Sequence, residues 1–287
     1  MKNNNVVCLV LNYNDPSTTQ EMVEAIKLYK TFNYILIIDN HSTDNSFEYL
    51  TKAFETDKHV IVKRTQKNGG YGYGNNFGVR YAKKQLNAKY VLLSNPDVRF
   101  SEKMVESLLK LMKSKNAAIV SGRQKMNSKF IDNPGWKIPS AFQWTLIETK
   151  FHDYAASKYY YPKKYFDVDY TKVDCVRGAN FLLDTDKFLE VDGYDERMFL
   201  YGEETLLGYK LKKAGYSSYI LNSQYYNHEV SSSISKSIPS VIRQIEITHD
   251  SKLVFYKYYL KINFISFNLY KNLFKLMISR KKKKLRI

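Results

Sequence analysis

The chain has 287 residues, of which 44% are hydrophobic, so it is long and apolar enough for one large α/β domain and too apolar for a disordered protein. Its two cysteines, Cys8 and Cys175, exclude a disulfide scaffold, and the N-terminal residues lack the pattern of a signal peptide, so we expect reduced thiols in a cytoplasmic protein. The net charge of +17 predicts an anionic partner, but no zinc-finger spacing, RNA-recognition signature or basic zipper accompanies it, so we predict no nucleic-acid partner.

Short apolar runs and helical patterns alternate over residues 1–122. The runs are typical of strands buried in a parallel sheet, and they cover 6–13, 34–39, 59–64, 90–94 and 117–122. Helical patterns lie between and after them at 17–31, 43–54, 72–86 and 101–115; the first begins with a Ser-Thr-Thr cap and the last with Ser101. This alternation predicts an α/β fold, with a mostly parallel sheet flanked by helices.

The pattern changes after residue 122. Residues 123–172 are aromatic and contain proline, and we interpret them as a substrate-contacting region or lid rather than a linker. Regular sequence returns at 174–185, followed by a predicted helix near 203–214 and a strand at 217–221. We therefore predict one domain over residues 1–239, with halves 1–122 and 123–239, and a separate segment over 240–287.

The C-terminal segment combines aromatic and aliphatic residues with a polar stripe. The stripe consists of Lys257, Lys261, Asn268, Lys271, Lys275 and Ser279. The longest uncharged run, 262–270, is much shorter than the roughly 20 residues that span a bilayer. An amphipathic helix before the basic residues 280–286 is typical of an anchor on an anionic membrane surface, and we predict that role. The alternative is a helix that packs on the domain and precedes a solvated tail.

Four consecutive predicted strands end in polar or glycine-rich sequence. Because the carboxyl ends of parallel strands meet at one edge of the sheet, where ligands bind, these endings predict one site. They are Asn12, Tyr13 and Asn14, then Asp39, Asn40 and Asp44, then residues 68–76, and finally Asn95 and Asp97. The glycine-rich stretch at 68–79 can bring backbone N–H groups and a helix N-terminus close to phosphates, although a flexible turn would have the same composition.

Later in the chain, acidic residues crowd into positions 195–204 of an otherwise basic protein. Glu203 and Glu204 fall in the first turn of a predicted helix, where the helix dipole favours negative charge, so a capping role is the simple interpretation. Their concentration also suits a general base, with Asp97 holding a divalent cation. His228 is a further candidate ligand, although a single histidine is more often structural.

Taken together, these motifs resemble those of the family-two glycosyltransferases with the GT-A fold, particularly bacterial rhamnosyltransferase-like members that build cell-surface polysaccharides. The matching stretches are LVLNYN (9–14), IIDNHSTDNS (37–46), NGGYGYGNNFGV (68–79), LLSNPDV (92–98), RGANFLL (177–183) and GYDERMFLYGEE (193–204). The resemblance implies an inverting transfer of a sugar from a nucleotide diphosphate donor to an acceptor hydroxyl. It also implies a nucleotide-sugar-binding half at 1–122 and an acceptor and catalytic half at 123–239.

The resemblance assigns roles to individual residues. Glu204 takes the place of the catalytic base, with Glu203 before it, while Asp97 and His228 take the places of metal ligands for Mg²⁺ or Mn²⁺. Donor contacts would come from the following residues: Asn12, Tyr13, Asp39 as reader of a pyrimidine base, Asp44, Asn68, Gly69, Gly70, Tyr71, Gly74 and Asn95. Arg177 would stabilise the diphosphate or contact an anionic acceptor, and a surface salt bridge is the equal alternative.

The chain departs from the family pattern at two positions. Asn95 stands where a full "DxD" motif has its first acid, which removes one anionic metal ligand, and Leu206 stands where the family often has an aspartate after the acidic pair. The implied donor is dTDP-L-rhamnose, with UDP-hexoses or UDP-galactofuranose as alternatives, and the implied acceptor is a polyprenyl-diphosphate-linked glycan at the inner face of the cell membrane. A non-catalytic protein that binds glycans or partner enzymes on the same fold is the alternative from another class.

Overall fold

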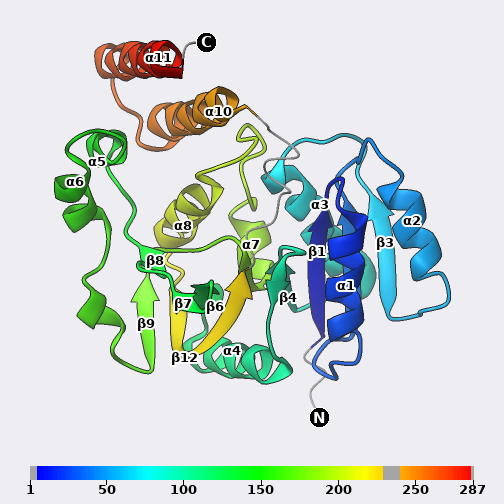
Figure 1. Cartoon of the computed structure of the whole chain (residues 1–287). Coiled ribbons are helices and arrows are strands. Elements are labelled where there is room, and N and C mark those ends of the chain that lie inside the picture. Colours follow the sequence, from blue (N-terminus) through cyan, green and yellow to red (C-terminus); the bar gives the residue numbers. More distant parts are fainter. Residues whose placement is uncertain (1–4, 229–239, 286–287) are drawn as a thin grey trace.

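The computed structural model describes residues 5–228 and 240–285, which form a twisted central sheet with helices packed around it (Figure 1). The strands follow one another across the sheet in this order: β3 (Val60–Arg64), β2 (Tyr34–Asp39), β1 (Val6–Asn12), β4 (Tyr90–Ser94), β11 (Asn180–Asp184), β6 (Ile119–Met126), β12 (Ser218–His228) and β5 (Val98–Arg99). Two short strands extend it, because β7 (Lys129–Phe130) pairs with β6 and β9 (Tyr170–Val173) pairs with β12. A separate two-stranded pair joins β8 (Gly135–Trp136) to β10 (Cys175–Val176).

The sheet is parallel in its first half and mixed in its second. β3, β2, β1 and β4 run parallel, as the strand–helix alternation predicts. β11 lies between β4 and β6 and is antiparallel to both, so the predicted strand at 117–122 does not extend the parallel set directly. β6 and β12 pair in parallel, with an irregularity between Leu221 and Tyr225. The antiparallel insertion brings β11 and the loop before it beside the end of β4.

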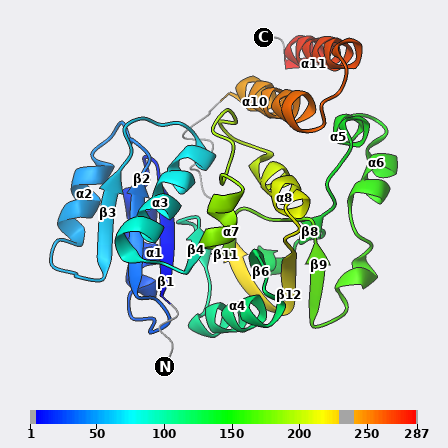
Figure 2. The same cartoon turned by 180° about the vertical axis from the view of Figure 1, so that it is seen from behind.

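Helices connect and cover the strands (Figure 2). They are α1 (Pro16–Ile26), α2 (Ser46–Ala53), α3 (Tyr71–Leu86), α4 (Glu102–Lys115), α5 (Ala141–Leu146), α6 (His152–Tyr159), α7 (Thr185–Glu190), α8 (Glu203–Lys213), α10 (Val241–Val254) and α11 (Phe264–Leu285). A 3₁₀ turn, η1, covers Lys163–Phe166, and a π-helical turn, η2, covers Phe255–Tyr259.

The structure differs from the sequence prediction at the start of the first helix. The predicted Ser-Thr-Thr cap was wrong, because α1 begins earlier, at Pro16. The fixed φ of proline suits the first helical position. Thr19 therefore lies inside the helix, where its hydroxyl donates to Asn12 Oδ1 at 2.8 Å. Ser101 does cap α4, since its hydroxyl accepts a hydrogen bond from Met104 N.

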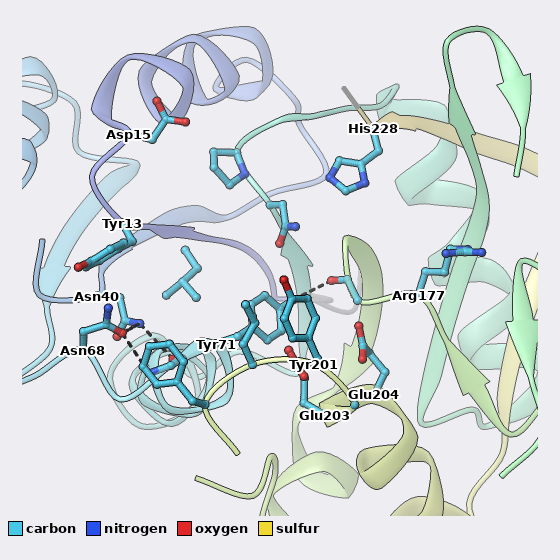
Figure 3. A pocket seen from close by; sticks show the side chains of 18 of the residues that line it. Tyr13, Asp15, Asn40, Asn68, Tyr71, Arg177, Tyr201, Glu203, Glu204 and His228 are labelled. Carbon is cyan, nitrogen blue, oxygen red and sulfur yellow. Dashed lines mark hydrogen bonds between the residues drawn. The ribbon is translucent and has the colours of Figure 1, made fainter. Parts of the chain in front are cut away.

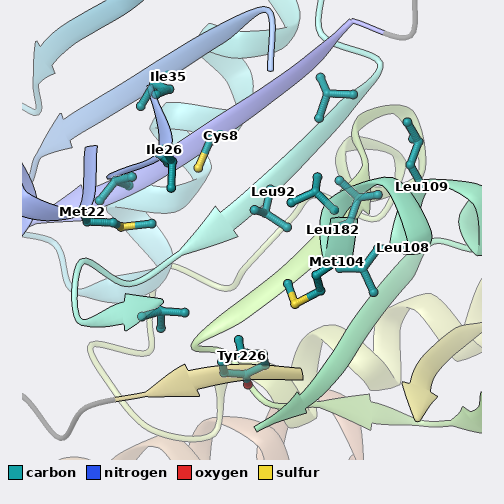
Figure 4. Packing of buried hydrophobic residues seen from close by; sticks show 14 of the residues in the cluster. Cys8, Met22, Ile26, Ile35, Leu92, Met104, Leu108, Leu109, Leu182 and Tyr226 are labelled. Carbon is teal, nitrogen blue, oxygen red and sulfur yellow. The ribbon is translucent and has the colours of Figure 1, made fainter. Parts of the chain in front are cut away.

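Alternate residues of the central strands supply the core on the two faces of the sheet. Cys8 and Leu92 face a cluster with Met22 and Leu108 (Figure 4), whereas Leu9 and Leu93 face a second cluster beneath α3 and α8. Continuous burial of β1 and β4 explains why their sequences read as unbroken apolar runs. Cys8 and Cys175 are both buried free thiols, and burial raises the pKa of each.

A third cluster joins the C-terminal helices to the middle of the chain. Phe255 and Tyr256 of η2 and Phe274 of α11 pack with Trp144 of α5 and Leu206 of α8. The C-terminal segment is not one continuous helix, because the π-helical turn and a non-helical stretch at 261–263, with Lys261 at φ +50°, divide it. The polar stripe therefore does not run along one helix.

Different parts of α11 have different surroundings. One face of α11, around Tyr270, Phe274 and Met277, packs on the third cluster, while Phe264 and Ile265 are each 80% exposed. Within residues 5–228 and 240–285, no helix has the length and apolar character needed to cross a bilayer. The predicted domain boundary at residue 239 and the basic residue Arg286 lie outside the described residues.

Candidate active site

A cavity of about 390 Å³ opens at the carboxyl ends of β1 and β4 and reaches the loop before β11 and the start of α8 (Figure 3). Tyr13, Asn40 and Asn68 lie on one side of it, and His228, Arg177 and Glu204 lie on the other. Of the residues expected from the sequence, these line it: Tyr13, Asn68, Gly70, Tyr71, Asn95, Arg177, Glu203, Glu204 and His228. The others, Asn12, Asp39, Asp44, Gly69, Gly74 and Asp97, are not part of its lining.

Asp39 lies beneath the wall of the cavity rather than in it. It has no exposed surface, and its Oδ2 accepts hydrogen bonds from Asn12 Nδ2 at 2.9 Å and from the Ser42 hydroxyl at 2.5 Å. Its Oδ1 accepts from Ser42 N at 2.9 Å, and Arg64 Nε lies 3.5 Å away. In this conformation Asp39 holds the loop after β2 against the end of β1.

Asp44 lies farther out and is exposed. Its Oδ1 accepts a hydrogen bond from Ser46 N at the start of α2, which is a local turn interaction. The neighbouring Asn14 and Thr43 tie the two loops together through a bond from Thr43 N to Asn14 Oδ1 at 2.8 Å. These contacts give Asp44 a structural role in the loop before α2.

The glycine-rich stretch is packed against the loop before α8. Gly70 has φ +92°, and a Cβ there would collide with the Phe199 backbone, so this position requires glycine. Tyr71 N donates to Phe199 O at 3.0 Å and Gly70 N donates to Asn68 Oδ1 at 3.1 Å. These two N–H groups thus already have acceptors in this conformation, and phosphate binding by the glycine-rich stretch stays a prediction.

The two glutamates at the start of α8 differ in their surroundings. Glu203 is 5% exposed, and its Oε2 is without a hydrogen-bond partner among the described residues. Burial, followed by the charge of Glu204, raises the pKa of Glu203 well above its usual range. Burial also raises the pKa of Glu204, while backbone N–H groups and the charge of Arg177 oppose that effect. Two carboxyl groups with different acidities thus stand side by side in the cavity.

His228 lines the cavity, and the buried Asp97 lies directly beside it. His228 Nε2 lies 3.1 Å from Asp97 Oδ2, although the two residues come from distant parts of the sequence. A carboxylate oxygen and an imidazole nitrogen fit Mn²⁺ or Mg²⁺, which complete their coordination with substrate phosphates and water. Across residues 5–228 and 240–285, no group of three or more acidic, histidine or cysteine side chains is arranged as a metal site.

Several cavity residues were not identified from the sequence. Gln124 on β6 is 7% exposed and contacts His228, and Trp136 on β8 donates its indole N–H to Thr205 Oγ1 at 3.0 Å. Both lie in the aromatic stretch 123–172 that we interpret as substrate-contacting, but no spacing rule singles them out. Phe199 and Tyr201, with φ +68° at Tyr201, line the cavity from the loop before α8.

The surroundings of Leu206 account for one departure from the family pattern. It is fully buried in the cluster that holds Phe255 and Tyr256, so its side chain faces the C-terminal helices instead of the cavity. An aspartate there would place a charge in apolar surroundings, which is costly without a partner. The leucine and the packed C-terminal segment are therefore consistent with each other.

Sequence comparisons identify relatives at low identity. The chain is 24% identical over 205 residues to the low-salt glycan biosynthesis hexosyltransferase Agl10 of Haloferax volcanii, covering 71% of this chain and 61% of that protein. It is 26% identical over 217 residues to the N-acetylglucosaminyl-diphospho-decaprenol L-rhamnosyltransferase of Mycobacterium tuberculosis, covering 69% of this chain and 67% of that protein. The chain thus spans about three fifths to two thirds of the length of these relatives.

Solved structures share the fold. GalNAc-T7 with UDP, GalNAc and Mn²⁺ superposes with a TM-score of 0.60 at 14% identity, covering 78% of this chain and 44% of that chain. The mannosyltransferase PcManGT from Pyrobaculum calidifontis, in complex with GDP-Man and Mn²⁺, superposes with a TM-score of 0.57 at 13% identity, covering 86% of this chain and 62% of that chain. The predicted GT-A fold is confirmed. Residues 8–188 match the family model described as "Glycosyl transferase family 2", and the chain therefore belongs to this glycosyltransferase family.

Proposed function

We propose that this protein is an inverting, metal-dependent glycosyltransferase, which transfers a sugar from a nucleotide diphosphate donor to a hydroxyl of a glycan acceptor. The observation that carries the proposal is that Glu204 and His228 line one cavity, with Asp97 in contact with His228. A general base and a cation-binding pair at one cavity suit the transfer of a sugar from its diphosphate to a hydroxyl.

Glu204 acts as the base in this proposal. Its carboxylate takes the proton of the acceptor hydroxyl while that oxygen attacks the anomeric carbon, and the bond to the diphosphate breaks on the opposite face. Burial raises the pKa of Glu204, which makes it a stronger base than an exposed carboxylate, while Arg177 favours its charged form. Glu203, whose pKa is raised further, is a neutral hydrogen-bond donor beside it.

The diphosphate is held where Arg177 and His228, with Asp97 behind it, face the cavity. When bound, Mg²⁺ or Mn²⁺ neutralises the charge that develops on the departing diphosphate. Asp97 and His228 are its ligands in this proposal, and the Mn²⁺ in two structures of the same fold supports a divalent metal. Asn95 lines the cavity beside them as a neutral donor contact.

The nucleoside occupies the opposite side, near Tyr13 and Asn68, with Asp39 holding the loops beneath it. Contact between Asp39 and the base, and roles for Asn12, Asp44, Gly69 and Gly74, stay predictions. We propose dTDP-L-rhamnose as the donor, supported by the name of the mycobacterial relative. UDP-hexoses and UDP-galactofuranose are the alternatives.

We propose a polyprenyl-diphosphate-linked acceptor at an anionic membrane surface, in bacterial capsule, O-antigen or cell-wall polysaccharide synthesis. The mycobacterial relative is named for a decaprenol-linked substrate, which supports a lipid-linked acceptor. α10 and α11 lie beyond the edge of the sheet where β1 ends, which is also the cavity's edge (Figure 1). The exposed Phe264, Ile265 and Leu269, with the nearby lysines of α11, suit peripheral binding to the inner face of the membrane.

Donor hydrolysis and transfer across a panel of nucleotide sugars, with and without Mn²⁺, test the proposal. We expect turnover of one pyrimidine nucleotide sugar that requires the cation. Binding of lipid-linked glycan without binding of any nucleotide sugar would instead favour the non-catalytic alternative and overturn the enzyme.

A further inference from the structure

Gln124 connects His228 to the interior of the protein. Gln124 Nε2 lies 3.0 Å from His228 Nδ1, and the hydroxyl of Tyr226 donates to Gln124 Oε1 at 3.3 Å. Gln124 is 7% exposed and Tyr226 is 1% exposed, so these polar groups depend on one another rather than on bulk water for their hydrogen bonds. The chain of contacts runs from Tyr226 through Gln124 and His228 to Asp97.

The direction of these bonds decides which nitrogen of His228 carries the proton. The amide nitrogen of Gln124 can only donate, so His228 Nδ1 must accept. In a neutral ring the proton then resides on Nε2, which donates to Asp97 Oδ2 at 3.1 Å. Nε2 is also the nitrogen that faces Asp97, so it is the one that a shared cation needs. In the arrangement observed, that nitrogen has no lone pair to offer.

We infer that Gln124 is a positioning residue that selects the tautomer of His228 and thereby sets the affinity of the Asp97–His228 pair for a divalent cation. The inference rests on the metal of the proposed function. Rotating the terminal amide by about 180° brings Oε1 to a protonated Nδ1 and leaves Nε2 unprotonated. The amide nitrogen then donates to the Tyr226 oxygen, so both orientations satisfy the amide.

No net proton is gained or lost in this exchange. The ring loses the proton on Nε2 and gains one on Nδ1, and the bond from Nε2 to Asp97 is given up when both side chains become ligands. Histidine ligands generally donate their second N–H to a fixed acceptor, and loss of such an acceptor typically lowers metal affinity about 10- to 100-fold. Among the described residues, the Gln124 amide lies in contact with Nδ1 and can provide this acceptor.

Nitrogen NMR of the histidine rings in the full chain tests the tautomer directly. We expect the proton of His228 on Nε2 without metal and on Nδ1 after addition of Mg²⁺ and UDP, with the His228→Asn variant assigning the signal. A proton already on Nδ1 in the metal-free protein would overturn the inference.

Mn²⁺ dissociation constants from electron paramagnetic resonance, measured with UDP, test the role of the side chain. Gln124→Leu should weaken Mn²⁺ binding about tenfold or more, whereas Gln124→Glu, whose carboxylate accepts from Nδ1–H, should bind at least as tightly as the unaltered chain. Gln85→Leu, an exposed change on α3, is the matched control. If Gln124→Leu does not fold, Gln124→Glu alone tests the inference. Mn²⁺ binding that is tenfold weaker in Gln124→Glu than in the unaltered chain would contradict it.

The outcomes separate the inference from the function on which it rests. If the unaltered chain binds Mn²⁺ and all Gln124 variants bind it within twofold, Gln124 is not a positioning residue and the metal-dependent enzyme stands. If the unaltered chain binds no Mn²⁺ with or without UDP, the metal-dependent function is overturned and the inference fails with it.

Discussion

Gly178 lies directly against Glu204. A Cβ at position 178 would come within 2.5 Å of Glu204 Oε1, and the carbonyl oxygen of Gly178 accepts a hydrogen bond from the Tyr71 hydroxyl at 2.7 Å. The loop before β11 therefore approaches the carboxylate as closely as it does only because residue 178 has no side chain.

Gly178→Ala should consequently displace Glu204 and lower kcat about 100-fold, because small errors in the position of a catalytic group are expensive. Steady-state transfer assays and donor binding by calorimetry measure the two effects separately. Gly215→Ala is a suitable control, since nothing lies within 4 Å of a Cβ there, and its φ of +85° costs only about 1 kcal/mol in stability. Equal turnover in both variants would contradict the close contact with the base.

The two glutamates should respond differently to amidation. Glu204→Gln should lower transfer by about 10²- to 10⁴-fold while donor binding persists, because the amide cannot accept the hydroxyl proton. Glu203→Gln should retain most of the activity, since a neutral carboxylic acid and an amide both donate hydrogen bonds. If Glu203→Gln were the inactive variant, the roles of the pair would be reversed.

The raised pKa of Glu203 predicts a pH dependence of stability. A carboxyl group with a folded-state pKa above its unfolded value of 4.5 keeps its proton longer when folded. Its contribution to stability is complete below that value and is lost as the pH rises toward the folded-state pKa, at up to about 1.4 kcal/mol per pH unit. Denaturant unfolding between pH 5 and pH 8 should therefore show a smaller decline for Glu203→Gln than for the unaltered protein. Parallel curves for the two proteins would contradict the raised pKa.

Leu206→Asp should destabilise the protein by about 3 kcal/mol or more without raising activity, because it buries a carboxylate in the cluster around Phe255. Leu206→Met, which conserves volume, should cost under about 1.5 kcal/mol. Urea unfolding measures the change in the free energy of unfolding for both variants. A stable and more active aspartate variant would mean that position 206 can face the cavity.

Membrane binding should depend on the exposed face of α11. Replacing Phe264, Ile265 and Leu269 with serine should weaken sedimentation with anionic liposomes and leave the melting temperature nearly unchanged, since these side chains are 80%, 80% and 67% exposed. Phe274→Ser, at a buried position of the same helix, should lower the melting temperature instead. Unaltered liposome binding by the triple variant would contradict the proposed anchor.

The sequence predicted the parallel half of the sheet because each of its strands is a continuous apolar run followed by a separate helical pattern. It did not predict that β11 is inserted antiparallel between β4 and β6, since strand order depends on pairing between residues far apart in the chain. Local propensity also failed at residues 255–263, where packing of Phe255 and Tyr256 against Trp144 accompanies a π-helical turn.

Within the site, motifs predicted residues that share a sequence signature, such as Asp97 and the acidic pair. Gln124 and Trp136 carry no such signature, because they reach the cavity through the pairing of β6 and β8 with other strands. The sequence also could not show that Asp39 is enclosed, because its three hydrogen bonds come from Asn12 at the end of β1 and from Ser42 in the loop after β2.

The packing of the C-terminal helices has a practical consequence for any shortened chain. Ser251 donates to Leu200 O at 3.0 Å, and Tyr259 donates to Asp195 Oδ2 at 2.7 Å, so α10 and η2 support the loop that carries Phe199 and Tyr201. Trimming the protein near residue 250 would therefore damage the cavity wall together with the proposed anchor, and loss of activity would say nothing about membranes. Point changes on the outer surface of α11 separate the two effects, and deletion does not.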